Sequence, residues 1–210
     1  MSDMNESESG GALGVAFFTR WLTLAAAAVD READRLTELD SAIGDADHGA
    51  NLKRGFAAVR DVLEKEPPQT PGAVLVTAGR QLISTVGGAS GPLYGTLLRG
   101  TGKGLGDSAT VSREQLAAAL TEGVAAVGRL GGAHPGDKTM LDALGPAAGA
   151  LGESFEAARD AAERGALATV PLQARKGRAS YLGERSVGHQ DPGATSSALL
   201  VAALAEAAAG

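Results

Sequence analysis

The sequence contains no cysteine, which excludes a disulfide framework, thiolate zinc sites and a cysteine nucleophile. Aromatic residues make up only 3% of the chain, so a core must be built mainly from Ala, Leu and Val. Apolar runs are far shorter than the roughly 20 residues of a membrane-spanning helix, and the acidic N-terminus is unlike a secretory signal. An excess of basic residues is also missing, because the net charge is −6, which argues against a nucleic-acid-binding surface.

The remaining composition is that of a compact globular domain. Hydrophobic residues make up 44% and charged residues 21% of the 210 residues, a length that one domain commonly has. We predict a disordered lead over residues 1–10 and a single domain over residues 11–210, in a cytoplasmic protein that binds neither membrane nor nucleic acid. The 30 glycines are many for a helical chain, and we expect them in turns, in helix caps and next to a ligand.

Apolar residues recur at helical spacing along most of the chain, whereas strand-like alternation is almost absent. Helix-ending and helix-starting residues divide this pattern. Pro67-Pro68 stops one helix, Pro71 starts the next, the capping box Ser112–Gln115 starts another, and Gly131-Gly132 ends it. The glycine run Gly100–Gly106 lacks the context of a nucleotide-binding motif, and we interpret it as a turn.

The pattern predicts an all-α fold of roughly eight helices, with short loops that make neighbouring helices antiparallel. The predicted segments are one or two helices over 17–39, and helices over 52–63, 71–86, 93–98, 112–130, 138–164, a segment before Arg178, and 193–209. Asp137 is expected to cap the long helix over 138–164, which Gly145-Pro146 should kink or interrupt.

Three carboxylates lie within eight residues of one another in the segment 40–47. Asp40 would end a helix, and Asp45 and Asp47 would follow on a returning loop, so the three side chains could converge on a hard cation such as Mg²⁺. The alternative is that Asp47 only caps the next helix and Asp45 forms an Asx turn. Spacing alone leaves both interpretations open. The ligand pattern of an EF-hand is absent, and a zinc site is disfavoured because His48 is the one nitrogen ligand nearby.

Glycine-rich loops precede several predicted helices, as in phosphate-binding sites. The loop Gly87–Pro92 offers bare backbone amides and the hydroxyl of Ser90. His48 and Asn51 lie where backbone N–H groups are free at a helix N-terminus and could face an anion. Walker and Rossmann motifs are absent from the sequence, so a nucleotide would have to bind through a different structural motif.

Two further loops are polar and too long for simple connections. One is His134–Met140, which enters a predicted helix, and the other runs from Arg178 to Gly193. In the second loop, Arg178 and Arg185 could supply positive charge to phosphate. The alternative for either arginine is a solvated side chain or an ion pair with Glu184.

Five motifs are specific when they are taken together. They are GDADHG at 44–49, GGASGP at 87–92, PGDKTM at 135–140, GRASYLGERS at 177–186 and GHQDPGAT at 188–195. In this order and spacing, the sequence closely resembles the nucleotide-binding L subunits (DhaL) of dihydroxyacetone kinase, over nearly the whole chain from about residue 11. The resemblance implies an all-α closed barrel of about eight antiparallel helices, with a nucleotide and two Mg²⁺ bound in the loops at one end.

The resemblance also implies which residues form the site. Asp40, Asp45 and Asp47 match the family's metal ligands. The residues that match its nucleotide contacts are His48, Gly49, Ala50, Asn51, Ala89, Ser90, Gly131, Met140, Arg178, Asp191, Pro192 and Gly193. No residue of this chain matches the histidine that holds the sugar on the family's K subunit, so the resemblance implies one part of a two-part kinase.

The function that the resemblance implies is that of an ADP-binding subunit. It would hold ADP or ATP with two Mg²⁺, be rephosphorylated by a phosphotransferase-system M subunit, and pass the phosphoryl group to dihydroxyacetone on the K subunit. Two Mg²⁺ held by aspartates would supply the positive charge that phosphoryl transfer requires. Three alternatives stay open: an ATP-dependent kinase subunit, a kinase for another short sugar or a fatty acid, and a nucleotide-binding regulatory module. A homodimer is left open as well.

Overall fold

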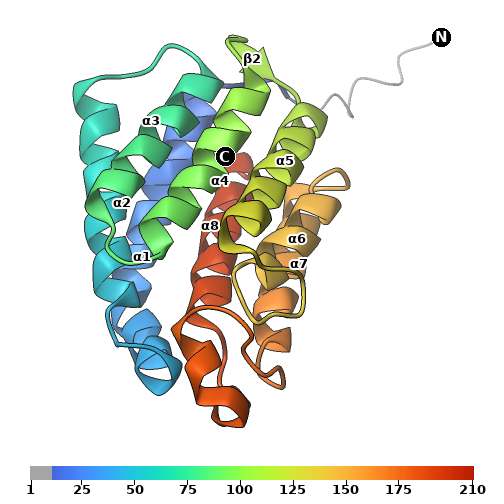
Figure 1. The fold of residues 1–210 in the computed structure, drawn as a ribbon. Coiled ribbons are helices and arrows are strands. Elements are labelled where there is room, and N and C mark those ends of the chain that lie inside the picture. Colours follow the sequence, from blue (N-terminus) through green and yellow to red (C-terminus); the bar gives the residue numbers. More distant parts are fainter. Residues whose placement is uncertain (1–10) are drawn as a thin grey trace, which may run out of the picture.

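The computed structural model describes residues 11–210 (Figure 1), and the predicted lead over 1–10 lies outside the described residues. The described part of the chain is almost entirely helical. Its elements are β1 (Leu13–Gly14), α1 (Val15–Ile43), α2 (His48–Lys65), α3 (Pro71–Thr85), α4 (Ser90–Leu105), β2 (Thr110–Val111), α5 (Arg113–Gly131), α6 (Leu141–Ala150), α7 (Phe155–Ala168), the 3₁₀ helix η1 (Arg178–Ser186) and α8 (Pro192–Ala208).

The helices pack as neighbours in chain order. Each α-helix contacts the next one, and α8 returns to contact α1, which is the order of neighbours that a closed barrel of helices requires. The two short strands pair antiparallel, with Leu13 opposite Val111, and they join the start of α1 to the segment before α5. The predicted all-α fold is confirmed, and the sequence pattern gave no sign of the strand pair because each strand has only two residues.

The core is aliphatic, as the scarcity of aromatic residues predicts. Leu, Val and Ala side chains from all eight α-helices form one buried cluster. Four of the seven aromatic rings lie inside it, and Phe18, Trp21, Phe56 and Tyr94 are each at most 2% exposed. The indole Nε1 of Trp21 donates a hydrogen bond to the carbonyl of Leu200 (2.9 Å), which ties the first long helix to the last one.

Many of the glycines lie inside helices, where they allow close helix packing. A Cβ atom at Gly79 of α3 would lie 2.7 Å from the carbonyl oxygen of Gly95, and a Cβ at Gly95 of α4 would lie 2.7 Å from that of Gly79. Gly102 approaches Gly72 in the same way, at 2.6 Å. The interpretation of Gly100–Gly106 as a turn is therefore wrong, because its residues up to Leu105 belong to α4. Close contact between two helices favours glycine, just as a tight turn does.

The predicted helix over 138–164 is also wrong in its extent. The segment forms two helices, α6 and α7, and the break lies at residues 151–154. Pro146 stands inside α6, where it has no N–H to donate to the carbonyl of Asp142. That carbonyl lies against Gly165 of α7, in the place that a Cβ at Gly165 would occupy. The backbones of α6 and α7 therefore lie close together where Pro146 interrupts the hydrogen bonding of α6.

Two other predictions in this region are corrected. Asp137 does not cap a helix; its carboxylate accepts a hydrogen bond from the backbone N–H of His134 (2.8 Å) within a loop. The helix expected before Arg178 is absent from the described residues, because residues 169–177 form turns and irregular structure. A 3₁₀ helix begins only at Arg178, after Gly177, whose φ of +65° favours glycine. By contrast, the first apolar pattern forms a single helix of 29 residues.

Alternate connections of the helices meet at the lower end of the molecule in Figure 1. These are residues 44–47, 86–89, 132–140 and 169–191, and together we call them the loop end. The strand pair lies at the opposite, upper end. Among the described residues, no helix is both long and apolar enough to cross a membrane.

Candidate functional site

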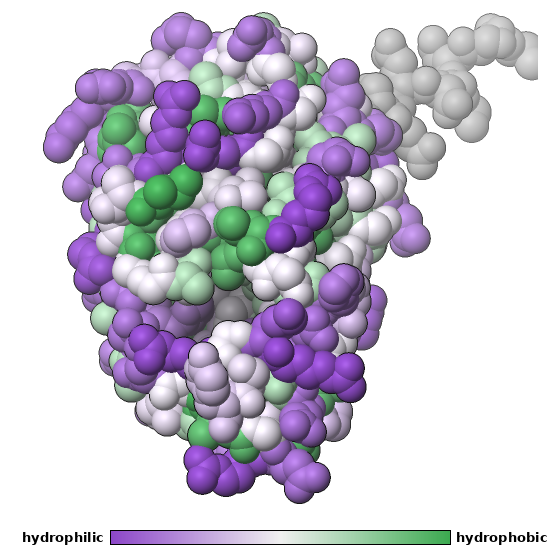
Figure 2. Space-filling view, in the orientation of Figure 1, coloured by the Kyte–Doolittle hydropathy of each residue, from purple (hydrophilic) through white to green (hydrophobic). Residues whose placement is uncertain are grey.

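A cavity of about 390 Å³ opens at the loop end, and all four loop segments line it. The space-filling view shows the surface hollowed in this lower half of the molecule (Figure 2). Because each segment follows a different helix, residues far apart in the sequence meet around one cavity. The five sequence motifs all contribute residues to its lining.

The three aspartates of the segment 40–47 converge at the rim of the cavity. One carboxylate oxygen from each of Asp40, Asp45 and Asp47 lies within 4.8 Å of the others. Asp40 is buried near the end of α1, whereas Asp45 and Asp47 are exposed on the loop. Asp47 stands at the N-cap position of α2, yet its side chain makes no capping hydrogen bond. Three convergent carboxylates are a hard oxygen donor set, which fits a divalent cation such as Mg²⁺.

Asp40 also fixes the shape of the loop. Its Oδ2 accepts hydrogen bonds from the backbone N–H groups of Asp47 (2.9 Å) and His48 (3.2 Å). The expectation that backbone N–H groups are free at this helix start is therefore wrong for the first two, because Asp40 occupies them. Ala46 between the aspartates has a φ of +62°, a left-handed conformation that costs a non-glycine residue roughly 1–2 kcal/mol. The loop keeps this conformation while it brings the three carboxylates together.

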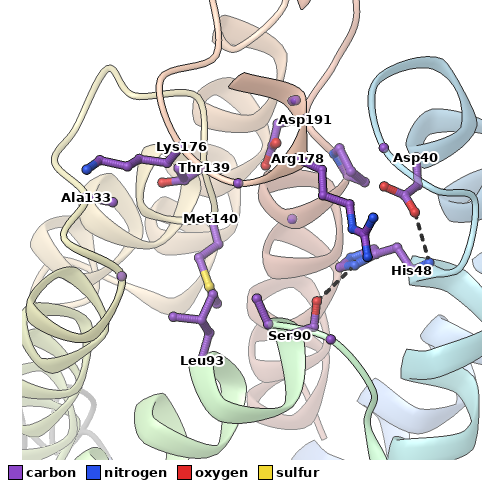
Figure 3. A pocket seen from close by; sticks show the side chains of 18 of the residues that line it. Asp40, His48, Ser90, Leu93, Ala133, Thr139, Met140, Lys176, Arg178 and Asp191 are labelled. Atoms are coloured by element: carbon purple, nitrogen blue, oxygen red, sulfur yellow. Dashed lines mark hydrogen bonds between the residues drawn. The ribbon is translucent and has the colours of Figure 1, made fainter. Parts of the chain in front are cut away.

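Arg178 completes the charge pattern of the acidic cluster. Its Nη2 lies 2.9 Å from Oδ2 of Asp45, so its ion-pair partner is Asp45 and not Glu184, the partner named as an alternative. Figure 3 shows the Arg178 side chain extending across the cavity toward Asp40 and His48. The carboxylates thus already attract a positive group from another loop, as a cation-binding cluster should.

A buried hydrogen-bond chain lies behind the cation cluster. Nδ1 of His48 and the hydroxyl of Ser90 are 3.2 Å apart, and Nε2 of His48 lies 2.8 Å from the hydroxyl of Ser196. The phenol of Tyr94 continues the chain to Ser196 (2.6 Å) and Ser197 (3.0 Å). Burial lowers the pKa of His48 and raises that of Tyr94 to about 12. His48 is therefore held as a neutral ring with both nitrogens engaged, and it orients Ser90 at the cavity.

The wall opposite the acidic cluster is largely apolar. Met140 and Leu93 lie side by side in Figure 3, and Val127, Leu130 and Gly131 line the same cavity. Apolar side chains around a glycine leave room for a flat ring, and ligand sites commonly combine such a wall with a few polar groups. The cavity therefore has a charged side and an apolar side.

Two buried charged residues hold the loops behind this wall. Nζ of Lys138 donates hydrogen bonds to three backbone carbonyls, those of Leu172 (3.0 Å), Ser186 (2.7 Å) and His189. Asp191 caps α8 by accepting a hydrogen bond from the N–H of Ala194 (2.7 Å). Burial raises the pKa of Asp191 to about 7, and burial lowers the pKa of Lys138.

Most of the predicted site residues lie around the one cavity. Those that line it are Asp40, Asp45, Asp47, His48, Ala89, Ser90, Gly131, Met140, Arg178, Asp191, Pro192 and Gly193. Gly49, Ala50 and Asn51 are outside the lining, on the first turn of α2. Gly49 packs against the carbonyl of Ala33 in α1, and Asn51 accepts a hydrogen bond from Arg54 (2.8 Å). Their role as nucleotide contacts stays a prediction.

The sequence interpretation missed Lys138, Thr139 and Tyr94, which also line the cavity. Lys138 and Thr139 stand within the PGDKTM motif, so their position was visible but their role was not. A lysine is rarely buried. The residues next to Lys138 in the sequence give no indication that its ammonium binds three carbonyls of distant segments. Tyr94 follows the phosphate-type loop by one turn of helix, which is the signal that could have found it.

Comparison with known proteins agrees with this geometry. The model of the DAK2 domain matches residues 42–206. The ADP-binding subunit DhaL of the PEP-dependent dihydroxyacetone kinase of Escherichia coli (strain K12) is 43% identical over 198 residues, which cover 90% of this chain and 94% of that protein. D-erythrulose kinase of Mycolicibacterium smegmatis is 37% identical, over 95% of this chain but only 37% of the kinase.

A solved structure shares the fold as well. The dihydroxyacetone kinase of C. freundii, in complex with AMP-PNP and Mg²⁺, aligns with a TM-score of 0.71 and 27% identity over 98% of this chain. The chain spans 37% of the length of that kinase. Since the family model covers most of the described residues and a DhaL subunit matches nearly from end to end, the chain belongs to the DAK2 domain family and, within it, to the DhaL subunits of dihydroxyacetone kinase.

Proposed function

We propose that this chain is the ADP-binding subunit of a dihydroxyacetone kinase. It holds ADP with Mg²⁺, accepts a phosphoryl group from a phosphotransferase-system M subunit, and passes it to dihydroxyacetone bound on a K subunit. The observation that carries the proposal is the convergence of Asp40, Asp45 and Asp47, within 4.8 Å, at the rim of a cavity with a glycine-rich loop and an apolar wall.

The charged side of the cavity suits the phosphates of the nucleotide. Asp40, Asp45 and Asp47 would hold two Mg²⁺, and Mg²⁺ supplies the positive charge that a polyphosphate and its transferring phosphoryl group require. Ala89 and Ser90 stand at the start of α4, where a helix N-terminus favours an anion. His48 fixes the Ser90 hydroxyl, and Arg178 brings a second source of positive charge from η1.

The apolar side of the cavity suits the base. Met140, Leu93 and Gly131 would flank the adenine ring, and the Asp191–Gly193 turn closes the same side through the start of α8. In this orientation the transferable phosphate would lie toward the exposed aspartates, where a partner subunit could reach it. The resemblance to DhaL subunits assigns the sugar-binding histidine to a separate K subunit, which is why the proposal includes one.

The choice of phosphoryl donor rests on the comparisons. The E. coli relative, named as PEP-dependent, is 43% identical to this chain, and a relative from Lactococcus lactis that is named as PTS-dependent is 40% identical. The D-erythrulose kinase is less similar, at 37%. Its name supports a second candidate function, a kinase for another short sugar, for which free ATP would be the alternative phosphoryl donor. Partners of the phosphotransferase type imply a cytoplasmic location.

Native mass spectrometry of the purified protein tests the proposal. We expect about one ADP for each chain, retained through purification and released when Mg²⁺ is chelated. Adding purified K and M subunits, phosphoenolpyruvate and the general phosphotransferase proteins should then yield dihydroxyacetone phosphate without added ATP. An empty chain that binds ATP reversibly, with product formed only when ATP is supplied, would favour the ATP-dependent kinase instead.

A further inference from the structure

Lys138 is a buried charged residue with no part in the proposed function so far. The residue is only 1% exposed, and its φ of +63° is one of two positive values among the described non-glycine residues. Its side chain runs inward from the PGDKTM loop and ends among three backbone carbonyl oxygens. A buried lysine in an unfavourable backbone conformation is stable only if specific contacts compensate for the lost hydration of its charge.

The three carbonyls account for the charge of Lys138. An ammonium group has three N–H donors and no acceptor, and each donor here has one carbonyl partner, on Leu172, Ser186 and His189. A neutral amine would aim its lone pair at one of these oxygens. The geometry therefore requires the charged form, although burial lowers the pKa of Lys138, and the nearby carboxyl of Asp191 acts in the opposite direction.

The segments that the ammonium joins are those that carry the site. Ser186 ends η1, and the same 3₁₀ helix begins at Arg178, whose guanidinium lies 2.9 Å from Asp45. His189 lies two residues before Asp191, at the start of α8. On the other side, Thr139 and Met140 follow Lys138 directly and line the cavity.

Other hydrogen bonds in this region are made by single backbone N–H groups. They run from Arg175 to Asp137 (3.0 Å), from Ala174 to the hydroxyl of Ser186 (2.9 Å), from Gly188 to Val170 (2.8 Å) and from Asp191 to the hydroxyl of Thr169 (2.9 Å). Each of these bonds joins only two segments. The Lys138 ammonium instead joins its own loop to Leu172, to the end of η1 at Ser186 and to His189 before α8, all at one point. These four N–H groups can also report whether the segments stay in place.

We propose that Lys138 is a positioning residue for the nucleotide site. It acts as a built-in cation that fixes η1 and the turn before α8 against the Met140 wall, and thereby sets Arg178 and Asp191 at the cavity. This inference rests on the proposed function for the identity of the ligand. It assigns no contact between Lys138 and the nucleotide, so its effect must pass through the three carbonyls.

Replacing the ammonium in two steps tests the inference. In Lys138→Ala, the dissociation constant of Mg·ADP, measured by calorimetry, should rise about 10- to 100-fold, as it does when supporting partners of a bound site are removed. Propylammonium, which equals the missing part of the side chain, should restore tight binding in a saturable way. Tetramethylammonium at the same concentration should not, since it carries a charge but no N–H donor.

Lys103→Ala is the matched control, because Lys103 is exposed near the end of α4 remote from the cavity and the change in net charge is the same. Its affinity for Mg·ADP should equal that of the unaltered protein. Unchanged affinity in Lys138→Ala, or weakened affinity that both ammonium ions restore equally, would overturn the inference. Should Lys138→Ala not fold alone, refolding with propylammonium but not with tetramethylammonium supports it, and refolding with neither contradicts it.

Amide hydrogen exchange gives a second readout that needs no nucleotide. Exchange at Ala174, Arg175, Gly188 and Asp191 should accelerate in Lys138→Met, while amides in the middle of α3 keep their rates. If the unaltered protein binds no Mg·ADP, the proposed function fails, and the exchange rates still decide the role of Lys138. Unaltered exchange at all four amides would refute that role.

Discussion

In the helical body, formed by α1 to α8, neighbouring helices meet through glycines and small apolar side chains. Gly79 and Gly95 bring α3 and α4 so close that neither has space for a Cβ atom. At the loop end, polar side chains instead bind backbone groups of segments far apart in the sequence, as Lys138 does with Ser186 and His189. Apolar contacts hold the body, and hydrogen bonds and ion pairs hold the loop end.

Because the two regions are held by different contacts, we expect the helical body to determine the unfolding free energy and the loop end to determine ligand affinity. Close-packed helices tolerate little change in volume, so alterations there should cost folding free energy and leave the site as it is. The loop end contains the convergent carboxylates, so alterations there should cost ligand affinity first.

The largest effect is expected at the acidic cluster. Asp45→Ala removes one of three convergent carboxylates and the ion-pair partner of Arg178. Mg²⁺-dependent binding of ADP should be lost in calorimetry, while the far-ultraviolet circular dichroism and the unfolding midpoint without ligand stay close to those of the unaltered protein. Asp107→Ala, an equal change in an exposed residue between α4 and β2, is the control. Tight binding that persists in Asp45→Ala would rule out the metal assignment.

A substitution in the helical body should show the reverse behaviour. In Gly79→Ala, the new Cβ would lie 2.7 Å from the carbonyl oxygen of Gly95 and 2.9 Å from the backbone nitrogen of Arg99. Overpacking of this kind costs about 1–3 kcal/mol of unfolding free energy, which urea denaturation can measure, and Mg·ADP affinity should not change.

Gly149→Ala in α6 is the control for Gly79→Ala, since a Cβ at Gly149 meets no atom within 4 Å. Alanine is the better helix former, so this variant should be stabilised by about 0.5–1 kcal/mol. Equal effects of the two substitutions would show that helix propensity, and not the approach of α3 to α4, decides the outcome.

Asp191 links the loop end to stability through pH. Burial raises its pKa from 3.8 to about 7, so between these pH values the folded protein binds a proton that the unfolded chain releases. Its contribution to the unfolding free energy is therefore present at low pH and is lost as the pH rises from about 4 to about 7. Asp191→Asn keeps an acceptor for the N–H of Ala194 but does not titrate.

The measurement for Asp191 is the unfolding free energy of both proteins from pH 4 to pH 8, with chelator and without nucleotide. The variant should gain stability relative to the unaltered protein as the pH rises, and the difference should level off above pH 7. A difference that does not change with pH would mean that the carboxyl of Asp191 stays ionised in the folded protein.

The two regions also differ in how far the sequence predicts them. Helix ends follow local signals, so the capping box at Ser112, the stop at Pro67 and the left-handed Gly132 after α5 were all predictable. The break between α6 and α7 was misplaced, because the local signal at Gly145-Pro146 lies inside α6, whereas α6 ends at Ala150 and Ser154 caps the start of α7.

At the loop end, the sequence motifs predicted which segments meet but not what holds them together. Asp40, Asp45 and Asp47 are close in sequence, so their convergence could be proposed from spacing. The partners of Lys138 and the pairing of Arg178 with Asp45 span 34 residues or more. Such pairs depend on how the helices bring the loops together, and a single sequence carries no local trace of them.

The smallest effect is expected at the start of α5, on the side of the body remote from the cavity. Ser112 accepts a hydrogen bond from the N–H of Gln115 (3.2 Å), and the Gln115 side chain accepts one from the N–H of Ser112 (2.8 Å). Ser112→Ala removes one half of this box and should cost about 1 kcal/mol of unfolding free energy. The nearby Ser108→Ala, at an exposed position between α4 and β2, should cost less. Because α5 also carries Gly131 to the cavity wall, a loss of Mg·ADP affinity in Ser112→Ala would show that the body and the loop end are coupled.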